Sequence, residues 1–448
     1  MQRIGSAAVL FLLLGRTALA ETLTLDQALG LAYETNPRLA AERAALRATD
    51  EDVAKALSGW RPTVSVSGSY GYTRDDTSPP DPVIAPNGHP RDGTVTLSQP
   101  VLNGSTIPQT REAKAGVQAG RAQLLSVEQA TLLDAAKAYF DVLGDEAELK
   151  YKRDNAALLA EQLDMTRQRV AIRDITRTDL ELVTSRLDAA KADVASAEAK
   201  LAASRDAFLR IIGRPAETLE ASPALPEVAG NEAAALNRAL ASNPDLLAAR
   251  ELSRQADAAV SVAVGALLPN LSLQAQYKNS VDEIASGVHD SALSLIAQLR
   301  VPLYQSGAEY AEIRRTKELY SKAVLGMADA ERRVRENLDS TWQMQRAART
   351  AIALHRQQVQ AAQSAYEGFL EGIKAGDRTT FDLLNSAQEL ISAQVALVEA
   401  HRQYNQSTFQ LVAATGGLTA RALDLPVAFY DPQVHYEDDA DRWIGTGK

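Results

Sequence analysis

Apolar residues recur at every seventh position over long stretches of this chain, and the same interval appears in two separate regions. The two series comprise Leu180, Leu187, Val194, Leu201 and Phe208, and then Leu383, Leu390, Leu397, Tyr404 and Leu411. A strict seven-residue repeat makes helices supercoil, because an unbent helix would rotate the apolar seam away from its partner. No proline occurs between Pro108 and Pro215 or between Pro302 and Pro426, so we expect long helices over 108–172, 177–213, 307–374 and 379–416.

Two other regions alternate apolar and polar residues with a period of two, which predicts β-strands. Residues 63–72 alternate valine and tyrosine with serine and threonine, and residues 271–278 alternate leucine with serine and glutamine. A second alternating stretch follows each of them. We therefore expect two β-hairpins, over 62–103 and 269–305, and four strands in the chain.

The residue types on these strands bear on their environment. Two soluble hairpins would be the commoner arrangement for such strands, but here the polar faces carry Ser, Thr and Gln, and tyrosines lie toward the strand ends. These features favour an outer-membrane barrel. Unpaired strand edges do not persist in hydrocarbon, and the smallest barrels have about eight strands. Four strands therefore require several chains, and the alternation is compatible with two or with three.

The chain consists of two copies of one module, each with a helix, a hairpin and two long helices. Asn36-Pro37 corresponds to Asn243-Pro244, Pro62 to Pro269, and Gly213 to Gly416. The expected boundaries are 21–213 for the first repeat, 214–230 for a linker, 231–416 for the second repeat, and 417–448 for a C-terminal segment with an acidic tail.

Residues 1–20 have the features of a cleavable secretory signal, with a basic start, an apolar run at 7–14 and a small-residue ending. Cysteine is absent, so neither disulfides nor a cysteine-linked lipid anchor are expected. The formal net charge of -10 disfavours a nucleic acid partner.

Neither an enzyme nor a metal or cofactor site is expected, because the histidines are scattered without ligand spacing and no phosphate loop or nucleophile motif accompanies them. They are His89, His289, His355, His401 and His435. The acidic run at 437–441 is expected to be a solvated tail, with cation binding as the less favoured alternative.

The duplicated module resembles the TolC family of outer-membrane efflux channels. The motifs that carry the resemblance are the Asn-Pro helices at Asn36 and Asn243, the hairpins entered at Pro62 and Pro269 and left at Pro100 and Pro302, and breaks ending in Thr178-Asp179-Leu180 and Phe381-Asp382-Leu383. The resemblance implies a mixed α and β membrane protein in the bacterial outer membrane. Three identical chains would form one twelve-stranded barrel, continued by a long coiled-coil helical tunnel in the periplasm.

The resemblance also implies a function as the passive exit duct of a tripartite export system. Its partners would be a periplasmic adaptor, an inner-membrane exporter such as an ABC or RND pump, and outer-membrane lipid. The C-terminal stretch 423–443 resembles that of members serving type I protein secretion. A drug or metal efflux channel is one alternative, and a structural periplasmic coiled-coil protein is the alternative from another class.

By the same resemblance, the two breaks are the tips of helical hairpins at the periplasmic entrance. Asp382 would form an acidic ring at the pore constriction, and Asn385 stands where a second acidic ring is usual. Three nearby carboxylates would attract cations and raise one another's pKa. The alternative role for Asp382 is capping of the returning helix, for which Asp377 and Thr379 are the better candidates.

The remaining positions divide into an entrance lock and an adaptor contact. The implied lock residues are Arg378, Thr178 and Asp179, together with Ile373, which stands where a hydrogen-bonding tyrosine is usual and would leave one link missing. The hairpin tips that would contact the adaptor comprise Arg173, Asp174, Ile175, Gly376 and Asp377. Arg173 also stands where a glycine is usual.

Overall fold

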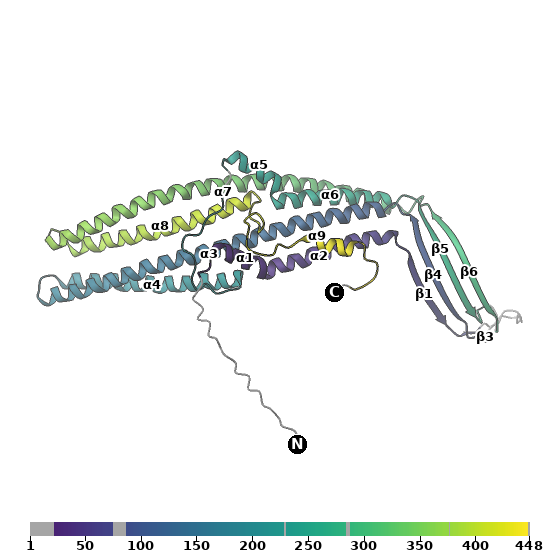
Figure 1. Cartoon of the computed structure of the whole chain (residues 1–448), viewed down its shortest axis with the longest axis horizontal. Helices are drawn as coiled ribbons and strands as arrows, with labels where there is room; N and C mark the ends of the chain where they lie inside the picture. The colour runs from purple at the N-terminus through teal and green to yellow at the C-terminus, as the bar shows by residue number, and fades with distance from the viewer. Residues whose placement is uncertain (1–21, 75–86, 228–229, 284–286, 376, 447–448) are drawn as a thin grey trace, which may run out of the picture.

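The computed structural model describes residues 22–74, 87–227, 230–283, 287–375 and 377–446. The predicted signal segment 1–20 and the tip residue Gly376 lie outside these residues. Figure 1 shows an elongated molecule with a β-sheet at one end and two helical hairpins at the other. Among the described helices, none is both long and apolar enough to cross a membrane.

Four helices build the rod. The first hairpin consists of α3 (Thr106–Ala171) and α4 (Arg177–Ile212), and the second of α7 (Ala308–Ala375) and α8 (Thr380–Ala414). At ~1.5 Å per residue, α3 alone is about 100 Å long. Between the hairpins and the sheet, α2 (Pro37–Leu57) packs beside α3, and α6 (Pro244–Gly265) packs against both α3 and α7. The rod is thus helices packed side by side along its whole length.

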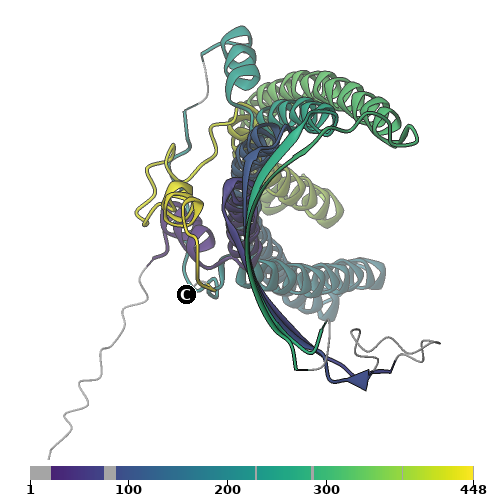
Figure 2. The ribbon, with the colours of Figure 1, turned by 90° about the vertical axis from the view of Figure 1, so that its right-hand side faces the viewer.

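The sheet has four antiparallel strands in the order β1-β4-β5-β6. They are β1 (Thr63–Tyr70), β4 (Arg91–Leu102), β5 (Asn270–Val281) and β6 (His289–Arg300), and two-residue strands β2 (Thr73–Arg74) and β3 (Asn87–Gly88) pair beyond β1 and β4. The short 3-10 helix η1 (Ser58–Trp60) leads from α2 into β1. Figure 2 shows the sheet curved into an open arc whose two edges are β1 and β6.

The register places residues of one kind in rows across all four strands. One row consists of Val66, Val95, Tyr277 and Leu293. The adjacent row points to the opposite face of the sheet and consists of Ser65, Thr96, Gln276 and Ser294. Val66 is 76% exposed and Leu295, on the apolar face, is 79% exposed. One face of the sheet therefore presents uncovered apolar side chains, as a lipid-facing surface requires.

Strand β4 runs through Pro100 and ends at Leu102, within the hairpin expected over 62–103. The register with β5 shifts between Pro100 and Leu102. Proline has no N–H to donate and is tolerated in a sheet mainly at edges and irregularities. The register shift thus lets an inner strand pass through the proline.

The Asn-Pro motif makes the same joint in both repeats. The Asn36 side chain accepts a hydrogen bond from the Arg38 N–H, which caps α2, and donates to the Ile211 carbonyl at 3.0 Å. In the second repeat the Asn243 side chain caps α6 and donates to the Ala414 carbonyl at 3.2 Å. Each motif therefore begins one helix and binds the end of a long helix.

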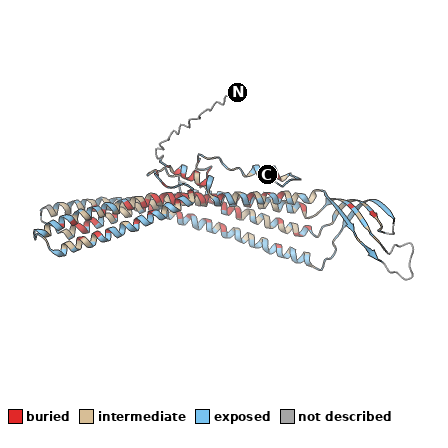
Figure 3. Ribbon diagram, turned by 90° about the horizontal axis from the view of Figure 1, so that it is seen from below, coloured by how far each residue is buried: buried red, intermediate tan, exposed pale blue. Residues whose placement is uncertain are grey.

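Buried residues are concentrated in the middle of the rod, whereas both ends are mostly exposed (Figure 3). There α1 (Leu25–Thr35) packs on α3 around Tyr139, Phe140, Phe208 and Phe409. The single O–H of Tyr139 is shared between the carbonyl oxygens of Leu23 and Glu220, each 3.0 Å from the hydroxyl oxygen. The segment after α4 is thereby fixed to the start of the chain. In the second repeat, α5 (Glu232–Ser242) packs on α7.

The acidic tail is exposed at Glu437, Asp438 and Asp441, as expected, but Asp439 is buried. Residues Pro432–Ala440 form the helix α9, which packs on α2. Asp439 is only 7% exposed, because His435 and Arg442 lie within ion-pair distance of its carboxylate. These two partners, the His435 ring and the Arg442 guanidinium, cannot be identified from the acidic run alone.

Candidate functional site at the hairpin tips

The first hairpin turns through a left-handed residue that is not glycine. Arg173 has φ 61°, its N–H donates to the Val170 carbonyl at 3.0 Å, and the Asp174 N–H donates to the Arg169 carbonyl at 2.9 Å. These bonds satisfy carbonyls at the end of α3, as a glycine-type helix terminus does. The turn therefore keeps its geometry, at a backbone cost of about 1 kcal/mol for a side chain in this region.

Matching capping boxes begin the two returning helices. Thr176 caps α4, and the Asp179 carboxylate accepts from the Thr176 N–H at 3.0 Å and from its hydroxyl at 2.7 Å. Thr379 caps α8, and the Asp382 carboxylate accepts from the Thr379 N–H at 3.1 Å and from its hydroxyl at 2.8 Å. Of the two capping candidates, Thr379 is the N-cap and Asp377 is not, while Asp382 itself completes the box.

These hydrogen bonds determine the charge of both carboxylates in a single chain. The pKa of Asp382 is lowered, chiefly by the Thr379 N–H and then by the Thr379 hydroxyl, and that of Asp179 is lowered chiefly by the Thr176 hydroxyl. The sequence expectation was a raised pKa from repulsion between three copies. In one chain the effect has the opposite sign, because donors aimed at a carboxylate favour its ionised form.

The implied lock residues do not pair with one another within one chain. The Arg378 guanidinium lies 5.1 Å from the centre of the Phe369 ring on α7. Across the described part of the chain no ion pair joins Arg378 to Asp179, whose carboxylate is bound to Thr176. Thr178 is exposed at the start of α4, and Ile373 is half-buried near the end of α7. A link between hairpins of neighbouring chains would use groups that remain accessible here.

Near the tips, α8 rests on the first hairpin through contacts that the sequence did not indicate. Leu384 is buried in a cluster with Leu163 and Val183 of α3 and α4. Arg186 Nη2 on α4 donates to Asn385 Oδ1 at 3.3 Å. Leu384 is next to the heptad residue Leu383, but the seven-residue pattern does not predict that Leu384 packs against the first hairpin. Asn385 thus binds the first hairpin of its own chain.

A buried charge cluster fixes the same helices closer to the middle of the rod. Asp145 on α3 is 3% exposed, and its Oδ1 lies 2.9 Å from Arg402 Nη1 on α8 and 3.0 Å from Lys200 Nζ on α4. A buried carboxylate requires such pairing. Three helices are therefore joined at one point, and the hairpin tips lie beyond it.

Comparison with known proteins finds similarity over nearly the whole chain, in both repeats. The sequence model of the family described as "Outer membrane efflux protein" matches residues 28–214 and 235–417, one match per repeat. The outer membrane efflux protein BepC of Brucella suis is 34% identical over 460 residues, covering 99% of this chain and 96% of that protein. The outer membrane protein TolC of Vibrio cholerae is 27% identical over 397 residues, covering 87% and 89%.

More distant similarities extend to a secretion protein and to solved structures. The alkaline protease secretion protein AprF of Pseudomonas aeruginosa is 24% identical over 343 residues, covering 75% of this chain and 71% of that protein. The crystal structure of the Campylobacter jejuni CmeC outer membrane channel has a TM-score of 0.78 at 16% identity, covering 93% of this chain and 89% of that one. At that identity the likeness concerns the fold.

Proposed function

The chain belongs to the outer membrane efflux protein family, and we propose that it is the exit duct of a type I protein secretion system. As a family member it is a subunit of a passive homotrimeric channel of the outer membrane with a long periplasmic tunnel, and not an enzyme. Such channels work with a periplasmic adaptor and an inner-membrane pump, for example an ABC or RND transporter.

Similarity to a protein named for alkaline protease secretion carries the assignment to protein cargo. A second relative, 23% identical, is named as a proteases secretion protein. Small-molecule efflux is the second candidate, because BepC, with the higher identity, is named an efflux protein. A passive duct has no cargo-binding chemistry of its own, so cargo class follows from the pump and adaptor it serves.

Deleting the gene in its own host separates the two candidates. We expect one or more exported proteins to disappear from the culture medium and accumulate inside the cell, while susceptibility to drugs and metals stays unchanged. Mass spectrometry of the medium and growth inhibition assays measure these outcomes. An unchanged set of exported proteins with increased drug or metal susceptibility would favour small-molecule efflux and contradict the protein-secretion assignment.

We further propose that the hairpin tips form the gate of the duct. Asp382 would line the constriction, and Arg378, Thr178 and Asp179 would hold neighbouring hairpins together. Support comes from their position: all four lie at the tips, beyond the point where the Asp145 cluster joins α3, α4 and α8. Arg173, Asp174, Ile175 and Asp377 lie at the turns, where an adaptor could contact them.

Replacing Arg378 with serine should raise the conductance of the purified channel in planar bilayers. The change removes a guanidinium that lies over the Phe369 ring in one chain and would donate to a neighbouring hairpin in the trimer, so the closed arrangement loses a link. The matched control is Arg173→Ser, which removes a positive charge from the first hairpin tip outside the proposed lock. Equal conductance for Arg378→Ser and the unaltered channel would remove Arg378 from the lock.

A further inference from the structure

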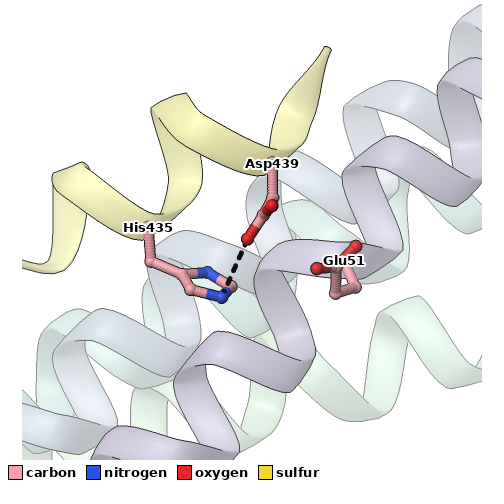
Figure 4. A group of neighbouring side chains, drawn as sticks. All are labelled: Glu51, His435 and Asp439. Atoms are coloured by element: carbon pink, nitrogen blue, oxygen red, sulfur yellow. Dashed lines mark ion pairs between the residues drawn. The ribbon is translucent and has the colours of Figure 1, made fainter. Parts of the chain in front are cut away.

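A cluster of titratable side chains lies where the tail helix α9 packs on α2, far from the hairpin tips. One donor atom from each of Glu51, His435 and Asp439 lies within 4.8 Å of the other two. Figure 4 shows the His435 ring and the Asp439 carboxylate turned toward each other on α9, with Glu51 beside them on α2. The three side chains come from the two ends of the chain.

The His435 ring lies between two carboxylates. Its Nε2 is 2.9 Å from Asp439 Oδ2, and its Nδ1 is 3.3 Å from Asp50 Oδ2. A neutral imidazole has one N–H and one lone pair, so it donates to only one of the two. The second carboxylate would then face a lone pair. A metal ion at Nε2, a second proton on the ring, or a proton on the buried Asp50 carboxyl would each relieve this contact.

Asp50 gives an independent indication that this cluster serves a ligand. Its side chain is 1% exposed, and although Nδ1 of His435 is near, neither carboxylate oxygen has a partner in hydrogen-bonding geometry. Buried polar groups are normally satisfied, and a buried carboxylate without a hydrogen bond is costly. Asp50 faces the ring nitrogen opposite to the one that faces Asp439. This is the place of the carboxylate that orients a metal-binding histidine.

We propose that this cluster is a binding site for a divalent transition metal ion such as Zn²⁺. His435 Nε2, Asp439 and Glu51 would bind the ion, and Asp50 would accept the Nδ1–H and hold the ring in place. One imidazole and two carboxylates suit Zn²⁺, which binds four ligands at about 2.0–2.2 Å and takes water as the fourth. Glu51 is exposed, so its side chain can rotate to close the remaining distance.

The surrounding cations leave the ligand atoms available. Arg442 Nη1 lies 2.6 Å from Asp439 Oδ1, the oxygen that does not face the imidazole. Arg121 of α3 stacks over the Tyr436 ring of α9 at 5.3 Å. The third carboxylate, Glu51, distinguishes a metal site from a protonated histidine clasp, because the clasp needs only Asp50 and Asp439.

Metal binding at this place would hold the C-terminal helix α9 on α2, the helix that leads through η1 into β1. Arg61, between α2 and β1, already donates to the Arg442 carbonyl at 2.8 Å and stacks with Trp443. The ion would therefore stabilise the packing of the C-terminal tail against the helix that precedes the sheet. Tryptic cleavage in the tail should become slower when Zn²⁺ is present.

Calorimetric titration of the detergent-solubilised full-length protein, stripped by a chelator, tests the site with Zn²⁺ itself. We expect one ion per chain, loss of that binding in His435→Ala, and a loss of affinity of at least about tenfold in Glu51→Gln and in Asp50→Asn. The Glu51→Gln variant keeps both carboxylates that face the ring, so a folding defect does not account for its effect. His355→Ala on α7 is the matched control and should bind normally.

Three results would overturn the site. The first is that Zn²⁺ does not bind to the stripped protein. The second is binding that His435→Ala and Glu51→Gln leave unchanged, which places the ion elsewhere. The third is a tail equally protected from trypsin with and without Zn²⁺, which means that no ion holds α9 on α2.

Discussion

Replacing Asp382 with asparagine should remove most of the channel's preference for cations. Three copies of the substitution act together, because each chain of the trimer contributes one carboxylate at the proposed constriction. In a single chain the hydrogen bonds from Thr379 lower the pKa of Asp382 and so favour the ionised carboxylate that the substitution removes. Reversal potentials in planar bilayers under a salt gradient measure the change. The effect should be largest in dilute salt, since screening lengths rise from about 10 Å at 0.1 M to about 30 Å at 0.01 M.

Thr379→Ala separates charge from helix capping. It removes the hydroxyl that caps α8 and donates to Asp382, but it keeps the backbone N–H at position 379 and leaves the carboxylate in place, so selectivity should survive even if the tip loosens. A channel that keeps its cation preference in Asp382→Asn would exclude this residue from the constriction. Loss of selectivity in Thr379→Ala to the same degree would show that the capping box, and not the ring of charge, determines the effect.

Gly416→Ala should destabilise the protein far more than the equivalent change Gly213→Ala. Both glycines end a long helix with positive φ, 77° and 81°, so each substitution places alanine in the left-handed region at about 1 kcal/mol. A Cβ at Gly416 would lie 2.4 Å from the Ser242 carbonyl oxygen, which is backbone, whereas one at Gly213 would lie 3.0 Å from the Thr35 hydroxyl. Because overpacking adds to this backbone cost, we expect Gly416→Ala to lower the free energy of unfolding by about 3 kcal/mol.

The thermal loss of the helical circular dichroism signal of the two purified variants measures this difference. Gly213→Ala controls for the backbone conformation, because the same Asn-Pro joint surrounds it. Equal destabilisation of the two variants would mean that the α8 terminus moves away from Ser242 freely. The joint between α5, α6 and the end of α8 would then not be the rigid element that its hydrogen bonds indicate.

The fold could be inferred from the sequence because its signals are periodic and duplicated. Seven-residue spacing identified the long helices, and period-two alternation identified the four strands of the sheet, whose rows such as Val66 to Leu293 separate apolar from polar faces. Pro100 was a weaker guide, because a register shift lets β4 continue past it. Local composition indicates where a strand can end, but pairing with β5 decides where it does end.

The capping role of Asp382 had a visible signal in the sequence. Thr176 and Asp179 stand three residues apart, as do Thr379 and Asp382, which is the spacing of a capping box. Contacts between distant segments had no such signal in the sequence. Two such contacts join helices from different repeats, Arg186 with Asn385 and Asp145 with Arg402. A heptad pattern predicts which face of a helix is apolar, but it does not predict which helix packs against that face.

The tail shows the same limit most clearly. A four-residue spacing places His435 and Asp439 on one side of a helix, but Asp50 and Glu51 lie near the opposite end of the chain. Only the packing of α9 on α2 brings them together. One residue of the acidic run, Asp439, is therefore buried against His435, while the other three stay exposed.

The central claim is that three identical chains share one hollow cylinder, closed where the free edge β6 of one chain meets β1 of the next. The natural chain has no cysteine, so introduced cysteines form no background bonds. We would pair Val66→Cys on β1 with single cysteines placed along β6, since a disulfide needs Cα atoms about 4.4–6.8 Å apart. After oxidation in the membrane, at least one pair should yield covalent species up to three chains and no larger. Monomers alone for every pair, or a ladder continuing beyond three chains, would contradict the account.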